Sequence, residues 1–295
     1  MTIELKNISK RFGHTQALDN VNLTISGNKI YGLLGNNGAG KSTMFNIITS
    51  RLFADSGELT MDGTPMSDND TVLNQIYMLG EKNYYPEGMK VKESIKWASI
   101  FYPNFDIGRA NELANLFQLP IKTKIEKLST GYQSIFKIVM SLSVNTPVLL
   151  LDEPVLGLDA QHRDMFYKLL LEQYSNKPST IVISTHLIAE AAALIEHCFI
   201  IKDGKVIKDA PSSELLEGGY SLSGPTALLD EFLKGREPLS TSNLGGLKTA
   251  YLSGEPPAAS QLPAGIEMGK LNLQEYFIQL VGGKTNGSTP NREGN

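Results

Sequence analysis

A glycine-rich stretch constrains this chain more than any other feature, and it reads Gly35-Asn36-Asn37-Gly38-Ala39-Gly40-Lys41-Ser42-Thr43. It fits the pattern G-x-x-x-x-G-K-[ST] at every required position. The apolar run 29–34 before it predicts a buried strand, and the spacing of residues 44–48 after it predicts a helix. Glycines let the backbone turn its N–H groups inward, and the helix directs its positive end to the same point. The stretch therefore predicts a phosphate-binding loop for a nucleoside triphosphate, with Lys41 between the β- and γ-phosphates and Ser42 as a ligand of Mg²⁺.

Two further apolar runs end in residues suited to the same chemistry. The run 148–151 predicts a strand buried on both faces, and it is followed by Asp152 and Glu153. Beside a phosphate loop, the first acid organises Mg²⁺ and the second activates the attacking water. A second buried strand at 180–185 is followed by His186, which is then in line with the acids and in reach of a γ-phosphate.

Three weaker signals each allow two interpretations. Phe12, just before a glycine turn, is either an adenine-stacking ring or an ordinary core residue. Ser129 and Gly131 open a helix, and they either bind an anion through backbone N–H groups or form an ordinary cap. The aromatic stretch 81–89 is either a partner contact or an irregular connection.

The rest of the pattern predicts an α/β fold with several parts. Residues 2–28 alternate as antiparallel strands do, and residues 81–140 have the pattern of an inserted helical subdomain. We expect an ATPase domain at residues 1–219, a small accessory domain at 220–281 and a flexible, polar tail at 282–295.

Composition narrows the class of partner. The chain has 295 residues, 41% of them hydrophobic, and a net charge of −4, which disfavours a nucleic-acid partner. No segment is long and apolar enough to cross a bilayer. We therefore expect a chain that is cytosolic, or one that is docked on a partner that is not itself cytosolic.

Taken in order, these motifs resemble those of the ATP-binding cassette family, the nucleotide-binding subunits of membrane transporters, over about residues 2–215. The resemblance implies a P-loop NTPase fold with a RecA-like core sheet, and it implies ATP and Mg²⁺ as cofactors. It also implies roles for single residues: Phe12 stacks on adenine, Asp152 organises Mg²⁺, Glu153 is the catalytic base and His186 senses the γ-phosphate. Ser129, Thr130 and Gly131 match the signature loop that completes the ATP site of the opposite subunit, and Asp159 matches an acid between subunits.

Three positions depart from the family pattern. Glu81 stands where a glutamine is usual, at the loop that meets the transmembrane partner and senses Mg²⁺ and water. Thr130 replaces a glycine and Tyr132 a glutamine of the signature. Because the serine and the second glycine remain, we expect γ-phosphate binding to survive and the rate of coupling to differ.

The function expected from this resemblance is ATP hydrolysis by a head-to-tail dimer, with an identical or closely related cassette, around two ATP molecules. The dimer would power a separately encoded transmembrane permease from the inner face of the cell membrane. The end of the chain, 220–281, resembles cassettes that export drugs and peptide antibiotics. Two alternatives are a soluble ATPase of the same fold that remodels a non-membrane partner and a non-catalytic nucleotide sensor, which the intact Lys41, Asp152, Glu153 and His186 disfavour.

Overall fold

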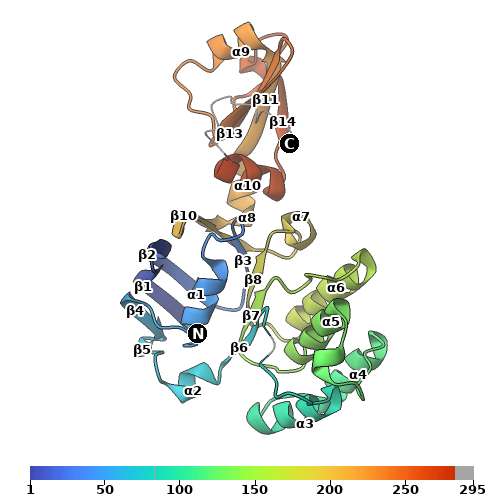
Figure 1. Ribbon diagram of the computed structural model, residues 1–295. Coiled ribbons are helices and arrows are strands. Elements are labelled where there is room, and N and C mark those ends of the chain that lie inside the picture. Colours follow the sequence, from blue (N-terminus) through green and yellow to red (C-terminus); the bar gives the residue numbers. More distant parts are fainter. Residues whose placement is uncertain (83, 283–295) are drawn as a thin grey trace, which may run out of the picture. The chain divides into compact units, whose positions relative to one another are not determined.

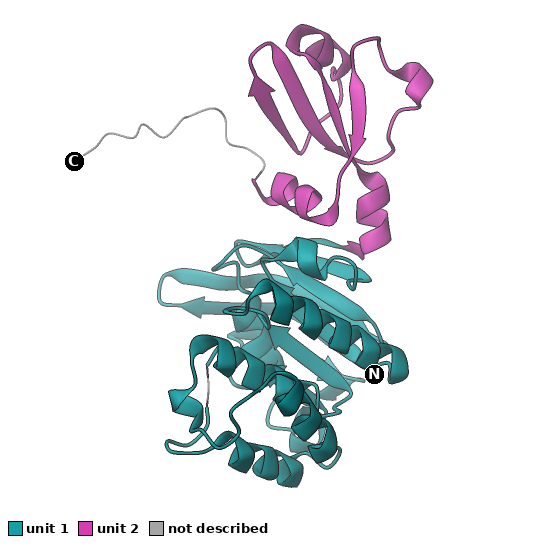
Figure 2. Cartoon of the chain, turned by 90° about the vertical axis from the view of Figure 1, so that its right-hand side faces the viewer, with its two compact units in different colours: residues 1–209 teal, residues 210–295 magenta. Residues whose placement is uncertain are grey.

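The computed structural model describes residues 1–82 and 84–282, which form two compact units divided after Asp209 (Figure 2). This division lies before the expected boundary at 219, because α8 (Ser212–Gly218) packs against α10 (Leu273–Gly282) in the second unit. Apart from Gly282, the expected tail lies outside the described residues. Within the described part of the chain, no helix is long and apolar enough to cross a membrane.

A six-stranded sheet is the centre of the first unit, in the order β10-β9-β3-β8-β7-β6. Its strands are β3 (Ile30–Leu34), β6 (Ile76–Leu79), β7 (Val148–Asp152), β8 (Thr180–Thr185), β9 (His197–Lys202) and β10 (Lys205–Pro211). Every residue of β3, β7 and β8 is buried, as expected of central parallel strands that are mostly apolar. Because β3, β7 and β8 pair in parallel, their carboxyl ends meet at one edge (Figure 1).

Helices pack against this sheet. They include α1 (Lys41–Ile48), α6 (Ala160–Asn176) and the short α7 (Ile188–Ala191). β9 and β10 are neighbours in the sheet and are joined by a two-residue turn, in which Asp203 and Gly204 both have positive φ, as a turn of this kind requires.

A second, antiparallel sheet packs into the same core, in the order β2-β1-β4-β5. Its strands are β1 (Thr2–Phe12), β2 (Thr15–Ser26), β4 (Ser56–Met61) and β5 (Thr64–Pro65), with the short α2 (Asp70–Leu73) following. Ile3, Leu5 and Ile8 of β1 are buried together with Met44 and Phe45 of α1. The predicted alternation is therefore confirmed.

The inserted helices form a cluster of their own (Figure 1), which consists of α3 (Val91–Phe101), α4 (Ile107–Leu116), η1 (Ile125–Lys127) and α5 (Thr130–Ser141). The apolar faces predicted for them are buried, including Val91, Ile95 and Ala98 on α3. Asp106 and Ser129 accept hydrogen bonds from backbone N–H groups in the first turns of α4 and α5, so both helices begin at side-chain caps.

The second unit has an antiparallel sheet in the order β12-β13-β11-β14. It consists of β11 (Gly219–Pro225), α9 (Thr226–Phe232), β12 (Ser240–Leu244), β13 (Leu247–Ser253), η2 (Ala259–Gln261), β14 (Glu267–Lys270), α8 and α10. Its own core includes Leu222, Leu229, Ala250 and Leu252. This sheet, core and flanking helices give residues 220–281 the compact structure expected of a small accessory domain.

Candidate active site

The phosphate loop connects β3 to α1 and is shaped by glycines that no other residue can replace. Gly38 and Gly40 have φ values of 80° and 112°. A Cβ atom at Gly40 would lie 2.5 Å from the carbonyl oxygen of Ala17, and one at Gly35 would lie 2.6 Å from that of Ile201. The loop can therefore hold this close backbone path only with glycine, and it leaves the N-terminus of α1 open to an anion.

Lys41 is buried at the start of α1, with only 6% of the residue exposed. Its Nζ donates hydrogen bonds to the carbonyl oxygens of Gly35 (2.7 Å) and Asn36 (3.2 Å). Burial lowers the pKa of Lys41, while the negative charges of Glu153 and Asp152 oppose that shift. The loop thus curls around a cation that it has withdrawn from bulk water, which strengthens the attraction of this cation for an anion.

Asp152 ends β7 and Glu153 follows it, at the edge of the sheet where the phosphate loop begins. Asp152 is 5% exposed, and its Oδ1 is a buried atom without a hydrogen-bond partner among the described residues. The same holds for Oε1 of Glu153, which lies 3.9 Å from Nζ of Lys41. Buried carboxylate oxygens are costly without partners, so this pair fits a site that takes up a cation or a polarised water.

This arrangement fits Mg²⁺, although the described residues show no cluster of three or more histidine, cysteine or acidic residues that holds a metal alone. Mg²⁺ keeps several waters and uses one or two protein oxygens with those of a phosphate. Asp152 and the hydroxyl of Ser42 supply oxygens of this kind, and both residues line one cavity. A full set of protein ligands is therefore not required.

His186 follows β8 and contacts the second acid directly. Its Nδ1 lies 2.8 Å from Oε2 of Glu153, and its backbone N–H donates to the same oxygen at 3.4 Å. Glu153 itself has φ 47°, and its backbone N–H donates to the carbonyl oxygen of Ser184. One carboxylate oxygen is thus held by the histidine and the other stays free, which is the geometry of an oriented general base.

These groups line one cavity of about 360 Å³. Its walls combine predicted residues of the phosphate loop, both acids, His186 and Glu81 with three residues that the motifs do not single out: Thr15, Ala17 and Leu156. Thr15 and Ala17 come from β2, which passes close to Gly40. Thr15 and Ala17 could be identified only from this close approach of β2 to the loop, which is a property of the fold.

Phe12 is 49% exposed at the end of β1, so the core-residue interpretation is wrong. It pairs with Thr15 of β2, which lines the cavity, although Phe12 itself does not. Its ring is therefore available to a base at the edge of the site.

The residues predicted to serve a second subunit lie outside this cavity. Ser129 is exposed and accepts a hydrogen bond from the N–H of Tyr132 at 3.4 Å, and Gly131 follows in the first turn of α5. Asp159 is also exposed and caps α6 by accepting from the N–H of His162 at 2.9 Å. Each has a structural role at a helix start, and each remains open to solvent.

Comparison with known proteins places these features in a family. Residues 18–156 match the family described as ABC transporter. The ABC transporter ATP-binding protein YtrB of Bacillus subtilis is 32% identical over 215 residues, which cover 73% of this chain and 74% of the relative. This chain belongs to the ABC transporter family. It is an ATP-binding subunit of that family and an ATPase.

Relatives and solved structures extend this ABC assignment. The bacitracin transport ATP-binding protein BcrA of Bacillus licheniformis is 25% identical over 302 residues, covering 97% of this chain and 99% of the relative. The dimeric structure of MJ0796, a bacterial ABC transporter cassette, has a TM-score of 0.63 and 28% identity, covering 71% of this chain and 98% of that one. Another MJ0796 structure, a dimeric post-hydrolysis state bound to ADP and Pi, has a TM-score of 0.62 and 27% identity, with coverage of 71% and 98%.

Proposed function

We propose that this chain binds and hydrolyses ATP in a head-to-tail dimer that encloses two ATP molecules and drives a separate transmembrane subunit in export. The observation that carries the proposal is the single cavity in which the phosphate loop, Asp152, Glu153 and His186 meet. Each group in it is positioned by the end of a buried central strand, so the arrangement is rigid before nucleotide arrives.

In this proposal, the backbone from Gly35 to Thr43 surrounds the phosphates, and Lys41 exchanges its bonds with the loop carbonyls for bonds with phosphate oxygens. Ser42 and Asp152 would hold Mg²⁺, which when bound would supply positive charge beside the phosphates, and Glu81 lines the same cavity, where it would contact the waters of the ion. Glu153 accepts a proton from the attacking water through Oε1, while His186 fixes Oε2.

The dimer explains why Ser129 and Asp159 are exposed and why these two residues and Gly131 lie outside their own cavity. The backbone N–H groups at the start of α5 would bind the γ-phosphate held by the other copy. The dimer of MJ0796 supports this arrangement, because it is a cassette of similar fold. The second copy is either identical or a close paralogue, and the proposal is the same for both.

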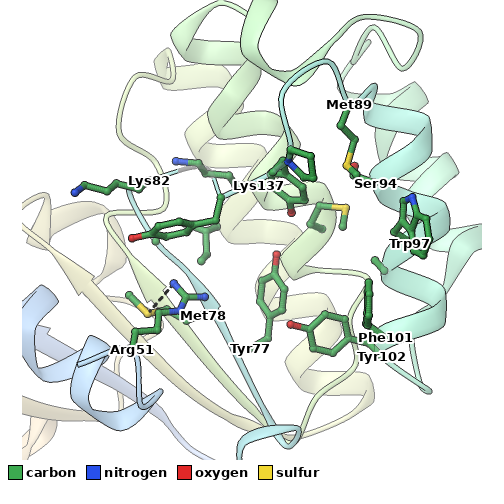
Figure 3. A pocket seen from close by; sticks show the side chains of 17 residues that line it. Arg51, Tyr77, Met78, Lys82, Met89, Ser94, Trp97, Phe101, Tyr102 and Lys137 are labelled. Carbon is green, nitrogen blue, oxygen red and sulfur yellow. Dashed lines mark hydrogen bonds between the residues drawn. The ribbon is translucent and has the colours of Figure 1, made fainter. Parts of the chain in front are cut away.

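A second cavity supports docking of a transmembrane partner, and we refer to it as the aromatic cavity (Figure 3). Its volume is about 520 Å³, and it is lined by side chains from β6, the segment 80–89, α3 and α5, together with Arg51. Trp97 and Phe101 of α3 stack with their ring centroids 6.0 Å apart, and both are about half or more exposed. An exposed aromatic group of this size marks an interaction surface, which favours the partner-contact interpretation of residues 81–89.

Charge on the aromatic cavity indicates what the partner presents. Arg51, Lys82 and Lys137 line it, and none of the described residues in its lining is acidic. Arg51 donates to the sulfur of Met78 and lies with its Cζ 5.6 Å from the ring centroid of Tyr84. Burial lowers the pKa of Lys137, whose Nζ donates to the carbonyl oxygen of Glu81. A partner helix with an apolar anchor and an acidic side chain fits this lining.

Export is favoured by the relatives that match nearly the whole chain, including the second unit. BcrA is named for bacitracin transport, and a Nod factor export protein is 24% identical over 95% of this chain. The match with the petrobactin import protein YclP covers 81% of the chain. We therefore place the protein on the inner face of the cell membrane, in complex with an export permease.

The central experiment replaces Glu153 by glutamine and compares it with Glu172→Gln, the same change at an exposed position of α6. Glu153→Gln should bind ATP, lose turnover and accumulate as a dimer in ATP and Mg²⁺, as measured by light scattering. Glu172→Gln should behave as the wild type. Normal turnover in Glu153→Gln would overturn the assignment of the base, and a monomer under every condition would overturn the dimer.

A further inference from the structure

Asp55 connects the segment after α1 to the end of β1 through three hydrogen bonds. Its Oδ1 accepts from Nζ of Lys10 at 2.6 Å, and its Oδ2 accepts from the backbone N–H of Arg11 at 2.7 Å. Its own backbone N–H donates to the carbonyl oxygen of Ser9 at 2.8 Å. These bonds join three consecutive residues, 9 to 11, that directly precede Phe12.

The backbone in this part of β1 needs such support. The pairing of β1 with β2 shifts register between Ile8 and Lys10 and again between Lys10 and Arg11. On the other edge, the last pair that β1 makes with β4 is Ser9 with Ser56. The Asp55 carboxylate therefore takes the N–H of Arg11 at a point where the neighbouring strand no longer does.

Lys10 transmits this support to the Phe12 ring. Its side chain is only 14% exposed, although it carries a charge, because Asp55 holds the ammonium against the protein. That ammonium lies 5.7 Å from the centroid of the Phe12 ring, within range of a cation–π interaction. The ring is thus fixed from one side while about half of the residue stays exposed.

We propose that Asp55 is a positioning residue for the base of ATP, because it fixes Lys10 and the backbone of Arg11 so that Phe12 presents a fixed face for stacking. This inference rests on the proposed stacking of adenine on Phe12. Holding the ring in place before binding lowers the entropy lost when ATP binds. The hydrogen bonds from Lys10 and Arg11 lower the pKa of Asp55 and so favour its charged form.

A purely structural role for Asp55 is the competing explanation, and the sheet offers a matched control for it. Asp62 accepts a hydrogen bond from the backbone N–H of Thr2 at 2.7 Å, at the opposite end of β1. Asp62→Asn keeps an acceptor for that N–H and loses only a 3.9 Å charge pair with the terminal amine of Met1. Asp55→Asn leaves one acceptor oxygen for two donors and removes the charge that holds Lys10.

The experiment measures the Kd of ATP and of inorganic tripolyphosphate, which has no base, by calorimetry on the full chain with Mg²⁺. The variants are Asp55→Asn, Asp62→Asn, Phe12→Ala and the double variant of Asp55 and Phe12, and melting temperatures record folding. We expect Phe12→Ala to raise the Kd of ATP roughly five- to hundredfold, since a base gains that much from aromatic stacking, and Asp55→Asn to raise it roughly three- to tenfold.

Neither change should alter the Kd of tripolyphosphate, Asp62→Asn should alter neither Kd, and the double variant should bind ATP no more weakly than Phe12→Ala alone. In steady-state hydrolysis, the defect of Asp55→Asn should fall on KM, with less than a twofold change in kcat. An equal loss of ATP and tripolyphosphate binding in Asp55→Asn, or additive losses in the double variant, would overturn the positioning role. If Phe12→Ala leaves the Kd of ATP unchanged, the stacking itself is wrong, and this outcome separates its failure from that of Asp55.

Discussion

Replacing Lys41 by methionine should separate the affinity for ATP from the stability of the fold. The ammonium is 6% exposed and makes two hydrogen bonds to loop carbonyls, each with a net contribution of about 1 kcal/mol. Methionine fills a similar volume and needs no partner. Losing the two bonds destabilises the fold, whereas removing a buried charge stabilises it. We therefore expect the melting temperature without nucleotide to change by less than about 5 °C.

ATP binding should respond much more strongly. A hydrogen bond between charged groups contributes roughly 1.5–3 kcal/mol, so losing Lys41 should raise the Kd of ATP by about ten- to a hundredfold. Calorimetry measures the Kd and differential scanning fluorimetry the stability, with Lys122→Met at an exposed position as the control. A Kd within threefold of the wild type would refute the role of Lys41. A melting temperature lower by more than about 8 °C would show that removing the buried charge does not offset the two lost hydrogen bonds.

The same residue predicts a pH dependence whose sign follows from its pKa. Burial lowers the pKa of Lys41 in the folded chain below the ordinary lysine value of 10.5. The unfolded chain then binds more protons in the range between the lowered pKa and 10.5, so this group opposes folding below that range and the opposition fades as the pH rises through it. The stability of the wild type relative to Lys41→Met should therefore increase with pH in that range, as urea unfolding at several pH values would measure. A decrease would show that the acids, rather than burial, dominate.

Three other changes test separate parts of the site. Gly40→Ala should weaken ATP binding and lower the melting temperature, because its Cβ would lie 2.5 Å from the carbonyl oxygen of Ala17. Gly246→Ala, whose Cβ would meet nothing within 4 Å, should do neither. Equal melting temperatures for the two variants would contradict this prediction. His186→Ala should lower kcat roughly 10²- to 10⁴-fold with little change in the Kd of ATP, because Glu153 Oε2 loses the imidazole at 2.8 Å and keeps only the backbone N–H at 3.4 Å. A fivefold or smaller effect on single-turnover hydrolysis would exclude the orienting role. Arg51→Glu should abolish co-purification with the permease, while Lys92→Glu on the exposed side of α3 should not; retained co-purification would show that the aromatic cavity is not the docking site.

The parts of the site that the sequence predicted are those that are local in the chain. The phosphate loop lies between a strand and a helix that adjoin it in sequence, and Asp152, Glu153 and His186 directly follow buried strands whose apolar runs are unmistakable. Parallel pairing of those strands then suffices to bring the residues together. The assignments of these residues as base, metal ligand and switch stay predictions.

Other parts could not be read from the sequence because they depend on how separate segments meet. Thr15 and Ala17 line the cavity only because β2 runs close to Gly40. In the second unit, β12 has mostly exposed residues and no apolar alternation, so it depends on its pairing with β13. The expected boundary at 219 followed the end of the family resemblance, while the division at 209 follows the packing of α8.

The geometry also connects the ATP cavity of one chain with the start of α5 on the same chain. Leu156 lines the ATP cavity, and its carbonyl oxygen accepts a hydrogen bond from the hydroxyl of Ser134 on α5 at 2.6 Å. A Cβ at Gly157 would lie 3.1 Å from the side chain of Thr130, in the first turn of that helix. The segment 154–158 therefore follows Glu153 directly, borders the cavity, contacts the start of α5 and ends beside Asp159. Packed segments move as units, so a displacement of Glu153 on hydrolysis would be transmitted through this segment to Ser129. In the proposed dimer, Ser129 binds the other ATP.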